Sequence, residues 1–236
     1  MSAAAVAAAK PATTRWWWVR HAPVTVNDGR CYGQTDHPCD CADEAVFDGL
    51  ARLLPKDAVW VTSNLQRTHL TAAAIVKAGL PGPDPIPGPG AIVEPDFVEQ
   101  HFGEWQGMRY ADIAKLQAEA YHRFWLAPAH KAPPGGESFV DLMGRVSGAI
   151  RRMNEAYAGR DIIAVTHGGT IRAALAEALD LSPEAALAFT IDNCSLTRLE
   201  RFDGAGEGHG WRVAAVNLLP GRDGASSGTG NPLRPA

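Results

Sequence analysis

Two histidines and two arginines of this 236-residue chain follow short apolar runs, in patterns that suit phosphate chemistry. Arg20 and His21 follow a run of tryptophan and valine, and His167 follows a similar run ahead of two glycines. Arg67 comes soon after Ser63, which closes a third apolar run. Arginine binds a phosphoryl group with two parallel hydrogen bonds, and a neutral imidazole is a competent nucleophile. These residue types together predict a cationic pocket for a phosphate ester.

Hydrolysis of such an ester needs a nucleophile and a proton donor. We expect nearby cations to keep His21 neutral, because positive charge disfavours imidazolium. The leaving oxygen needs a proton, and Glu99 is the best candidate to supply it, with Asp96 and Glu104 as competing carboxyl groups. Gly168 and Gly169 lead into a predicted helix, whose first amide groups favour an anion.

The elements that must position these residues are predicted from the apolar runs. Strands without alternation are expected over 16–20, 58–62 and 162–166, as in strands buried on both faces. Helices are expected over 42–54, 65–78 and 170–179. This alternation predicts an α/β fold: a three-layer α/β/α arrangement with a mostly parallel central sheet and helices on both faces. Ligands of such sheets bind at the carboxyl ends of the strands.

The rest of the chain gives weaker patterns. We expect a short strand over 95–98, helices over 110–117, 121–126 and 137–157, and closing strands over 195–200 and 212–217. The Pro/Gly-rich stretch 81–90 is interpreted as a surface loop, because the pieces on its two sides complete one site. One domain is therefore expected over 15–219, between tails 1–14 and 220–236 whose composition is typical of disorder.

Five motifs, taken in order, resemble the histidine phosphatase superfamily, also called phosphoglycerate-mutase-like, over roughly residues 16–217. They are Arg20-His21-Ala22, Ser63-Asn64-Leu65-Gln66-Arg67, Glu99 ahead of Phe102-Gly103-Glu104-Trp105-Gln106-Gly107, Pro134-Gly135-Gly136-Glu137-Ser138, and Thr166-His167-Gly168-Gly169-Thr170. Two departures stand out. Val24 replaces the threonine expected after the first motif, and Cys39-Asp40-Cys41-Ala42-Asp43 replaces a Leu-Thr-x-x-Gly stretch.

The resemblance implies a phosphomonoester hydrolase with a phosphohistidine intermediate and a phosphoglycerate-mutase-like fold. It implies that His21 attacks phosphorus, that Arg20, Arg67 and His167 hold the phosphoryl oxygens, that Asn27 adds a hydrogen bond, and that Glu99 transfers the proton. No metal and no cofactor are expected, since the arginines supply the positive charge that a metal would supply.

Several residues stay open between a role in the pocket and a structural one. Glu137 could contact the substrate or cap the helix it precedes. His101 could line the pocket, and Arg109 could contact the far end of the substrate. The aromatic-rich segment within 105–137 is expected to form a cap-like insertion over the pocket or to pack in the core. The histidines at 37, 69, 122, 130 and 209 share no pattern that indicates a metal site.

Composition narrows the class of partner. The net charge of −4 argues against nucleic acid or an anionic membrane as the main partner, so a small phosphorylated metabolite is expected. No apolar run approaches the roughly 18 residues of a membrane span. The four cysteines fit neither a zinc ribbon nor a disulfide framework, which favours reduced thiols and a cytoplasmic protein. The sequence leaves a homodimer open.

Within the family, the closest resemblance is to bacterial α-ribazole phosphatases of cobalamin synthesis. It rests on Arg-His-Ala-Pro at 20–23, Cys-Tyr-Gly-Gln-Thr-Asp at 31–36 and Pro-Gly-Gly-Glu-Ser-Phe at 134–139. The alternatives are a cofactor-dependent phosphoglycerate mutase, a broad-specificity sugar-phosphate phosphatase, and an inactive family member that serves as a binding module. A mutase needs cations for a second anionic group, and the segment 115–131 has only Arg123 between its terminal lysines.

Overall fold

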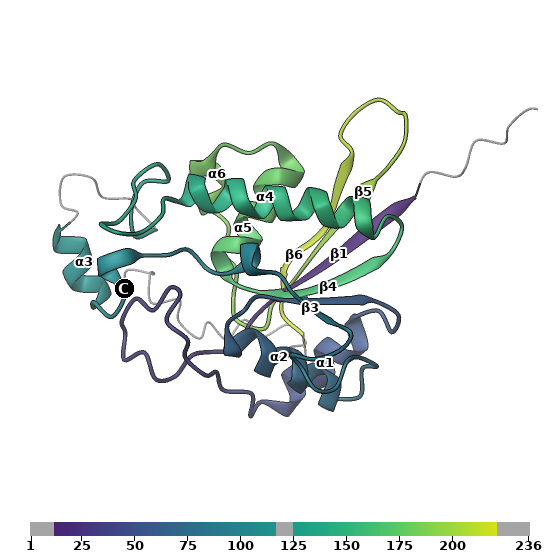
Figure 1. The fold of residues 1–236 in the computed structure, drawn as a ribbon, viewed down its shortest axis with the longest axis horizontal. Coiled ribbons are helices and arrows are strands. Elements are labelled where there is room, and N and C mark those ends of the chain that lie inside the picture. Colours follow the sequence, from purple (N-terminus) through teal and green to yellow (C-terminus); the bar gives the residue numbers. More distant parts are fainter. Residues whose placement is uncertain (1–11, 117–124, 221–236) are drawn as a thin grey trace, which may run out of the picture.

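The computed structural model describes residues 12–116 and 125–220 of the chain. They form a six-stranded sheet with the strand order β3-β2-β4-β1-β5-β6 (Figure 1). The strands are β1 Thr13–Arg20, β2 Val59–Thr62, β3 Ala91–Val93, β4 Asp161–Thr166, β5 Leu196–Phe202 and β6 Trp211–Leu218. All pairings among the first four are parallel, whereas β5 is antiparallel to both of its neighbours. The prediction of a mostly parallel sheet is confirmed.

Helices cover both faces of this sheet, as expected for a three-layer α/β/α fold. On one face lie α1 Glu44–Leu53 and α2 Gln66–Lys77, and on the other lie α4 Phe139–Ala156, α5 Gly168–Leu179 and α6 Pro183–Leu187 (Figure 1). The shorter α3 Tyr110–Leu116 lies away from both layers (Figure 1). Each face buries its own apolar cluster, one built on the α4–α5 side and one on the α1–α2 side.

The three adjacent tryptophans in the middle of β1 are explained by the central place of this strand in the sheet. Trp16 and Trp18 point to the α4–α5 side, where their rings stack with centroids 4.7 Å apart. Trp17 points to the opposite side, against the α1–α2 cluster. Because a buried aromatic ring removes a large apolar area from water, this strand anchors both cores. It thereby fixes the residues that follow it.

One expected strand is wrong. Residues 95–98 do not extend the sheet, because Pro95–Phe97 form a 3₁₀-helix, η1. The side chain of Glu94 caps the start of this helix by accepting a hydrogen bond from the amide of Asp96. Pro95 lacks the N–H that a strand would use, and it suits the first position of a helix. A second 3₁₀-helix, η2 Gly103–Trp105, follows. The strand of this region is β3, which comes directly after the Pro/Gly-rich loop.

Other boundaries differ by a few residues. The strand β1 begins at Thr13, within the range expected as a tail. The remainder of both expected tails, and most of the helix expected over 121–126, lie outside the described residues; Trp125 and Leu126 form a bend. The helix α6 was not expected, although Ser182 and Pro183 are a typical helix start. Among the described helices, none has the length and apolar character needed to cross a membrane.

Candidate active site

Strands β1, β2 and β4 end at one edge of the sheet, and the polar residues that follow them meet there. Arg20 pairs in register with Thr166, so His21 and His167 leave the sheet at the same level. Their ring centroids lie 5.2 Å apart. Ser63, after β2, is hydrogen-bonded to Nε2 of His167 at 2.8 Å. The predicted convergence of these strand ends therefore holds in the structure.

His21 is held in one tautomer by the backbone. Its Nδ1 lies 2.7 Å from the carbonyl oxygen of Ala22, and because a carbonyl only accepts, Nδ1 carries the proton. The lone pair is then on Nε2. Burial first, and then Arg67 and Arg20, lower the pKa of His21 well below its usual value. The imidazole is therefore neutral at pH 7, with burial as a larger cause than the cations expected from the sequence.

Arg20, Arg67 and His167 surround this imidazole with hydrogen-bond donors. Arg67 is fully buried and donates to the carbonyl oxygens of Gly33 and Thr35, while Arg20 donates to a carbonyl in the loop before β5. Nε of both arginines and Nδ1 of His167 are buried without a hydrogen-bond partner among the described residues. Buried donors are nearly always paired in folded proteins. Unpaired nitrogens next to the His21 imidazole are suited to an anionic ligand.

Glu99 lies at the first turn of α5, beside these donors. Its carboxylate accepts hydrogen bonds from the amides of Gln100 at 3.0 Å and Gly169 at 3.2 Å. A Cβ on Gly169 would overlap this carboxylate and would also come within 2.9 Å of Leu142. The second glycine after His167 is therefore required for the carboxylate to reach the helix.

A cavity of about 390 Å³ opens next to these groups. The expected site residues in its lining are Arg20, Asn27, Glu99 and Gly168, whereas the buried His21, Arg67 and His167 lie outside the lining. Phe102 also lines the cavity, and three side chains of the expected cap segment complete the wall: Tyr110, Trp125 and Leu126. The cavity thus combines charged and polar groups with aromatic and apolar side chains, which is typical of a site for a small organic molecule.

Glu137 and His101 lie outside this cavity lining. Ser138, not Glu137, caps α4, and it does so in a capping box with Asp141. Glu137 instead pairs with Arg145 at 2.7 Å and accepts a hydrogen bond from the backbone amide of His101. These contacts differ from both roles left open for Glu137 by the sequence. Arg109 is likewise outside the lining and forms an exposed ion pair with Asp28.

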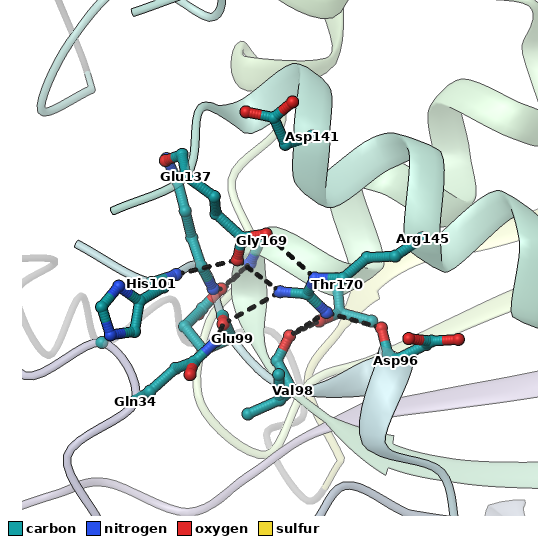
Figure 2. A network of polar contacts seen from close by, with 12 residues as sticks. Gln34, Asp96, Val98, Glu99, His101, Glu137, Asp141, Arg145, Gly169 and Thr170 are labelled. Atoms are coloured by element: carbon teal, nitrogen blue, oxygen red, sulfur yellow. Dashed lines mark hydrogen bonds and ion pairs between the residues drawn. The ribbon is translucent and has the colours of Figure 1, made fainter. Parts of the chain in front are cut away.

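The Arg145–Glu137 pair belongs to a network that holds the Glu99 loop (Figure 2). Besides Glu137, the guanidinium of Arg145 donates to the backbone carbonyls of Asp96, Val98 and Glu99. The loop that carries Glu99 is thus tied to α4 through three of its own carbonyl groups.

Three residues of the site were not expected from the sequence. Tyr32 lines the cavity under Arg67, whose guanidinium lies 5.1 Å from the ring centroid. Asn193 lines it as well and donates to the carbonyl of His21 at 2.8 Å. Arg172 lines it one helical turn after Gly168. Only Arg172 had a readable signal, because residues four apart on a helix share a face.

Within the described residues, no group of three or more His, Cys, Asp and Glu side chains is arranged to hold a metal ion. The four cysteines are free, and Cys39 and Cys41 lie with their sulfurs 3.7 Å apart.

Comparison with known proteins finds relatives of several activities. A metal-independent phosphoserine phosphatase from Arabidopsis thaliana is 33% identical over 161 residues, which is 66% of this chain and 64% of that protein. A 2,3-bisphosphoglycerate-dependent phosphoglycerate mutase from Gloeobacter violaceus is 32% identical over 187 residues, 75% of this chain and 80% of that one. A bifunctional protein from Mycobacterium tuberculosis is 34% identical over 149 residues; the match covers 63% of this chain but only 38% of that protein.

Solved structures share the fold. The mycobacterial glucosyl-3-phosphoglycerate phosphatase in complex with VO3 has a TM-score of 0.68 at 26% identity, covering 86% of this chain and 98% of that one. The α-ribazole phosphatase from Shigella flexneri has a TM-score of 0.68 at 23% identity, covering 87% and 97%.

The sequence profile of the histidine phosphatase superfamily (branch 1) matches residues 16–217. This range contains all the strand ends, both histidines and the carboxylate described above. With its motifs, its fold and its relatives in agreement, the chain belongs to branch 1 of the histidine phosphatase superfamily.

Proposed function

We propose that this protein is a metal-independent phosphomonoesterase that hydrolyses a small phosphorylated metabolite through a phosphohistidine on His21. The observation that carries the proposal is a neutral, buried imidazole with its Nε2 lone pair free, surrounded by unpaired guanidinium and imidazole nitrogens. A tetrahedral phosphoryl group can accept from all of these donors. The relative solved with VO3 binds a small oxyanion in the same fold, which supports this reading.

The proposed reaction has two steps. Nε2 of His21 attacks phosphorus, the bond from phosphorus to the ester oxygen breaks, and Glu99 donates a proton to that oxygen. Glu99 then takes a proton from water, whose oxygen attacks phosphorus as the P–N bond breaks and inorganic phosphate forms. Arg20, Arg67 and His167 stabilise the negative charge of both transition states, where most of the rate gain should arise.

Asn27 stays a proposed substrate contact. It lines the cavity, and its side-chain amide donates to the carbonyl of Arg30 at 3.3 Å, a long hydrogen bond that a phosphoryl oxygen could replace. Gly168 is a proposed backbone contact at the start of α5.

The substrate is proposed more narrowly from the motifs. α-Ribazole 5′-phosphate is one candidate, supported by the resemblance of the early loop and of the Pro-Gly-Gly-Glu-Ser-Phe stretch. The likeness to solved α-ribazole phosphatases supports only the shared fold. The relatives named as phosphoserine and glucosyl-3-phosphoglycerate phosphatases support other small phosphate esters equally well.

The test is release of inorganic phosphate from p-nitrophenyl phosphate with EDTA present. Wild type should be active, and His21→Ala should lose activity by several orders of magnitude because the nucleophile is absent. His209→Ala is the matched control, since that histidine is exposed in the β5–β6 turn. Activity that requires added metal, or that survives in His21→Ala, would contradict the proposal.

A mutase is the second candidate, favoured by the Gloeobacter relative. Incubation with 3-phosphoglycerate and catalytic 2,3-bisphosphoglycerate separates the two. A phosphatase releases phosphate from the ester, whereas a mutase forms 2-phosphoglycerate with little release of phosphate.

A further inference from the structure

Arg172 is a third arginine of the cavity, and its side chain is fixed in place. It lies on α5, is 6% exposed and forms part of the cavity wall. Its Nε donates to the carbonyl of Phe189 at 2.8 Å, and its guanidinium carbon lies 4.6 Å from the ring centroid of Trp125. These contacts orient the guanidinium and leave its two Nη groups for a ligand.

The charge of Arg172 is not balanced by the protein. No carboxylate forms an ion pair with it among the described residues, and Glu99 and Asp192 act on it only from a distance. Burial, followed by Arg20, lowers the pKa of Arg172 to about 10, so it remains a cation at neutral pH. A buried cation without a partner is costly, which makes such a group a candidate for ligand binding.

Arg172 and Arg20 lie close enough to act on one molecule. The position of a Cβ on Gly168 would be 3.2 Å from Nη1 of Arg172 and 3.6 Å from Nε of Arg20. The absence of a side chain at Gly168 therefore leaves room between the two guanidinium groups. If Arg20 holds the phosphoryl group, the next few atoms of the substrate lie within reach of Arg172.

We propose that Arg172 binds a carboxylate of the substrate, so that the protein prefers phosphate monoesters of small carboxylic acids in which the acid lies a few bonds from the ester oxygen. This inference rests on the proposed function, because it requires the phosphoryl group at Arg20. A carboxylate fits better than a second phosphate. One guanidinium with its Nε already bonded offers two Nη groups and a single positive charge, which match a planar monoanion and not a dianion.

The experiment compares two esters that differ only by a carboxylate, O-phosphoserine and O-phosphoethanolamine. The readout is the ratio of their kcat/KM values, since a general loss of activity cancels in this ratio. Wild type should prefer phosphoserine. Arg172→Gln should lower the ratio on the order of 10- to 100-fold, the loss expected for a charged, bidentate hydrogen bond, and Arg172→Lys should lower it less. Arg151→Gln, an exposed arginine that pairs with Glu177 of α5, should leave the ratio unchanged.

Equal losses on both esters would assign Arg172 to the phosphoryl group and overturn the inference. An unchanged ratio, or a wild type without preference, would overturn it too. Isothermal titration calorimetry with His21→Ala measures the affinity of the two esters without turnover, and so tests separately whether Arg172 binds the carboxylate. If wild type hydrolyses neither ester, the proposed phosphatase activity is refuted. The carboxylate site would still be supported if His21→Ala binds phosphoserine more tightly than phosphoethanolamine and the double variant with Arg172→Gln binds the two esters equally.

Discussion

Two groups of arginine side chains near Glu99 use their hydrogen-bond donors in opposite ways. One is the Arg145 cluster, which is Arg145 with its acceptors, and the other is the pair Arg20 and Arg67 beside His21. In the Arg145 cluster, every guanidinium nitrogen donates, to Glu137 or to backbone carbonyls (Figure 2). Beside His21, Nε of both Arg20 and Arg67 lacks a partner among the described residues. A saturated arginine is a structural tie that holds a loop, while an unsaturated one keeps donors for a ligand. Between these two groups burial does not distinguish the roles, whereas the number of satisfied donors does.

Substitution of an arginine whose Nε lacks a partner, Arg20 or Arg67, should give the largest loss of catalytic rate. Arg20→Gln removes a positive charge beside the attacked phosphorus, and kcat with p-nitrophenyl phosphate should fall by about 10²–10³-fold. Stability should change by no more than about 1 kcal/mol, because Arg20 makes one hydrogen bond through its side chain. Steady-state kinetics and urea denaturation measure both. A kcat within threefold of wild type would refute a role for Arg20 in the transition state.

Substitution of Arg145, all of whose guanidinium nitrogens donate, should lower stability strongly and kcat only moderately. Arg145→Gln leaves Glu137 without its cation and three carbonyls without their donor, so the free energy of unfolding should fall by about 2–3 kcal/mol. We expect kcat to fall only about tenfold, through poorer placement of Glu99. Urea denaturation and the same kinetic assay check this.

Arg152→Gln is the matched control on the same helix. This arginine is 58% exposed and pairs at the surface with Asp96 and Glu94, so its loss should leave the urea midpoint close to that of wild type. Glu137→Gln tests the sequence-based alternative of a substrate contact. It should leave KM nearly unchanged, and a large rise in KM would place Glu137 in substrate binding after all.

The smallest expected effect is a dependence of the free energy of unfolding on pH. The pKa of His21 is lowered by burial and by the neighbouring arginines, so below about pH 6.5 the unfolded chain binds a proton that the folded chain does not. Stability should therefore decrease as the pH falls below this value. In His21→Asn the decrease should be smaller, with the remainder due in part to His167, whose pKa is lowered for the same reasons. Urea denaturation at pH 7.5, 6.5 and 5.5 measures it, and identical slopes in the two proteins would count against a buried neutral His21.

The fold class and the strand-end residues were predictable because both depend on local patterns. An uninterrupted apolar run followed at once by Arg20 and His21 indicates a buried strand and a residue at its carboxyl end. His167 repeats this pattern, whereas Arg67 lies in the first turn of the helix that follows β2, and the sheet then brings them together.

The Arg145 network and the third arginine of the cavity were less accessible. Arg145 reaches carbonyls 46 to 49 residues earlier in the chain, and backbone acceptors leave no trace in residue type. The strand expected over 95–98 is wrong for a local reason, because Pro95 lacks the N–H of a strand and suits the start of a helix. The sequence leaves Glu137 open between a substrate contact and a helix cap, and its partner Arg145 on α4 could not be inferred from spacing alone.

The hydrogen bond from the amide of Gly169 to Glu99 has a consequence for how this site can vary. The donor belongs to the main chain, so replacing one amino acid by any other except proline leaves it in place. What a replacement adds is volume, and the carboxylate already occupies the space where a methyl group would lie. A substitution at position 169 therefore disrupts this contact through steric overlap with the carboxylate and not through loss of the donor. Only the smallest residue at position 169 keeps the acid within reach of the helix.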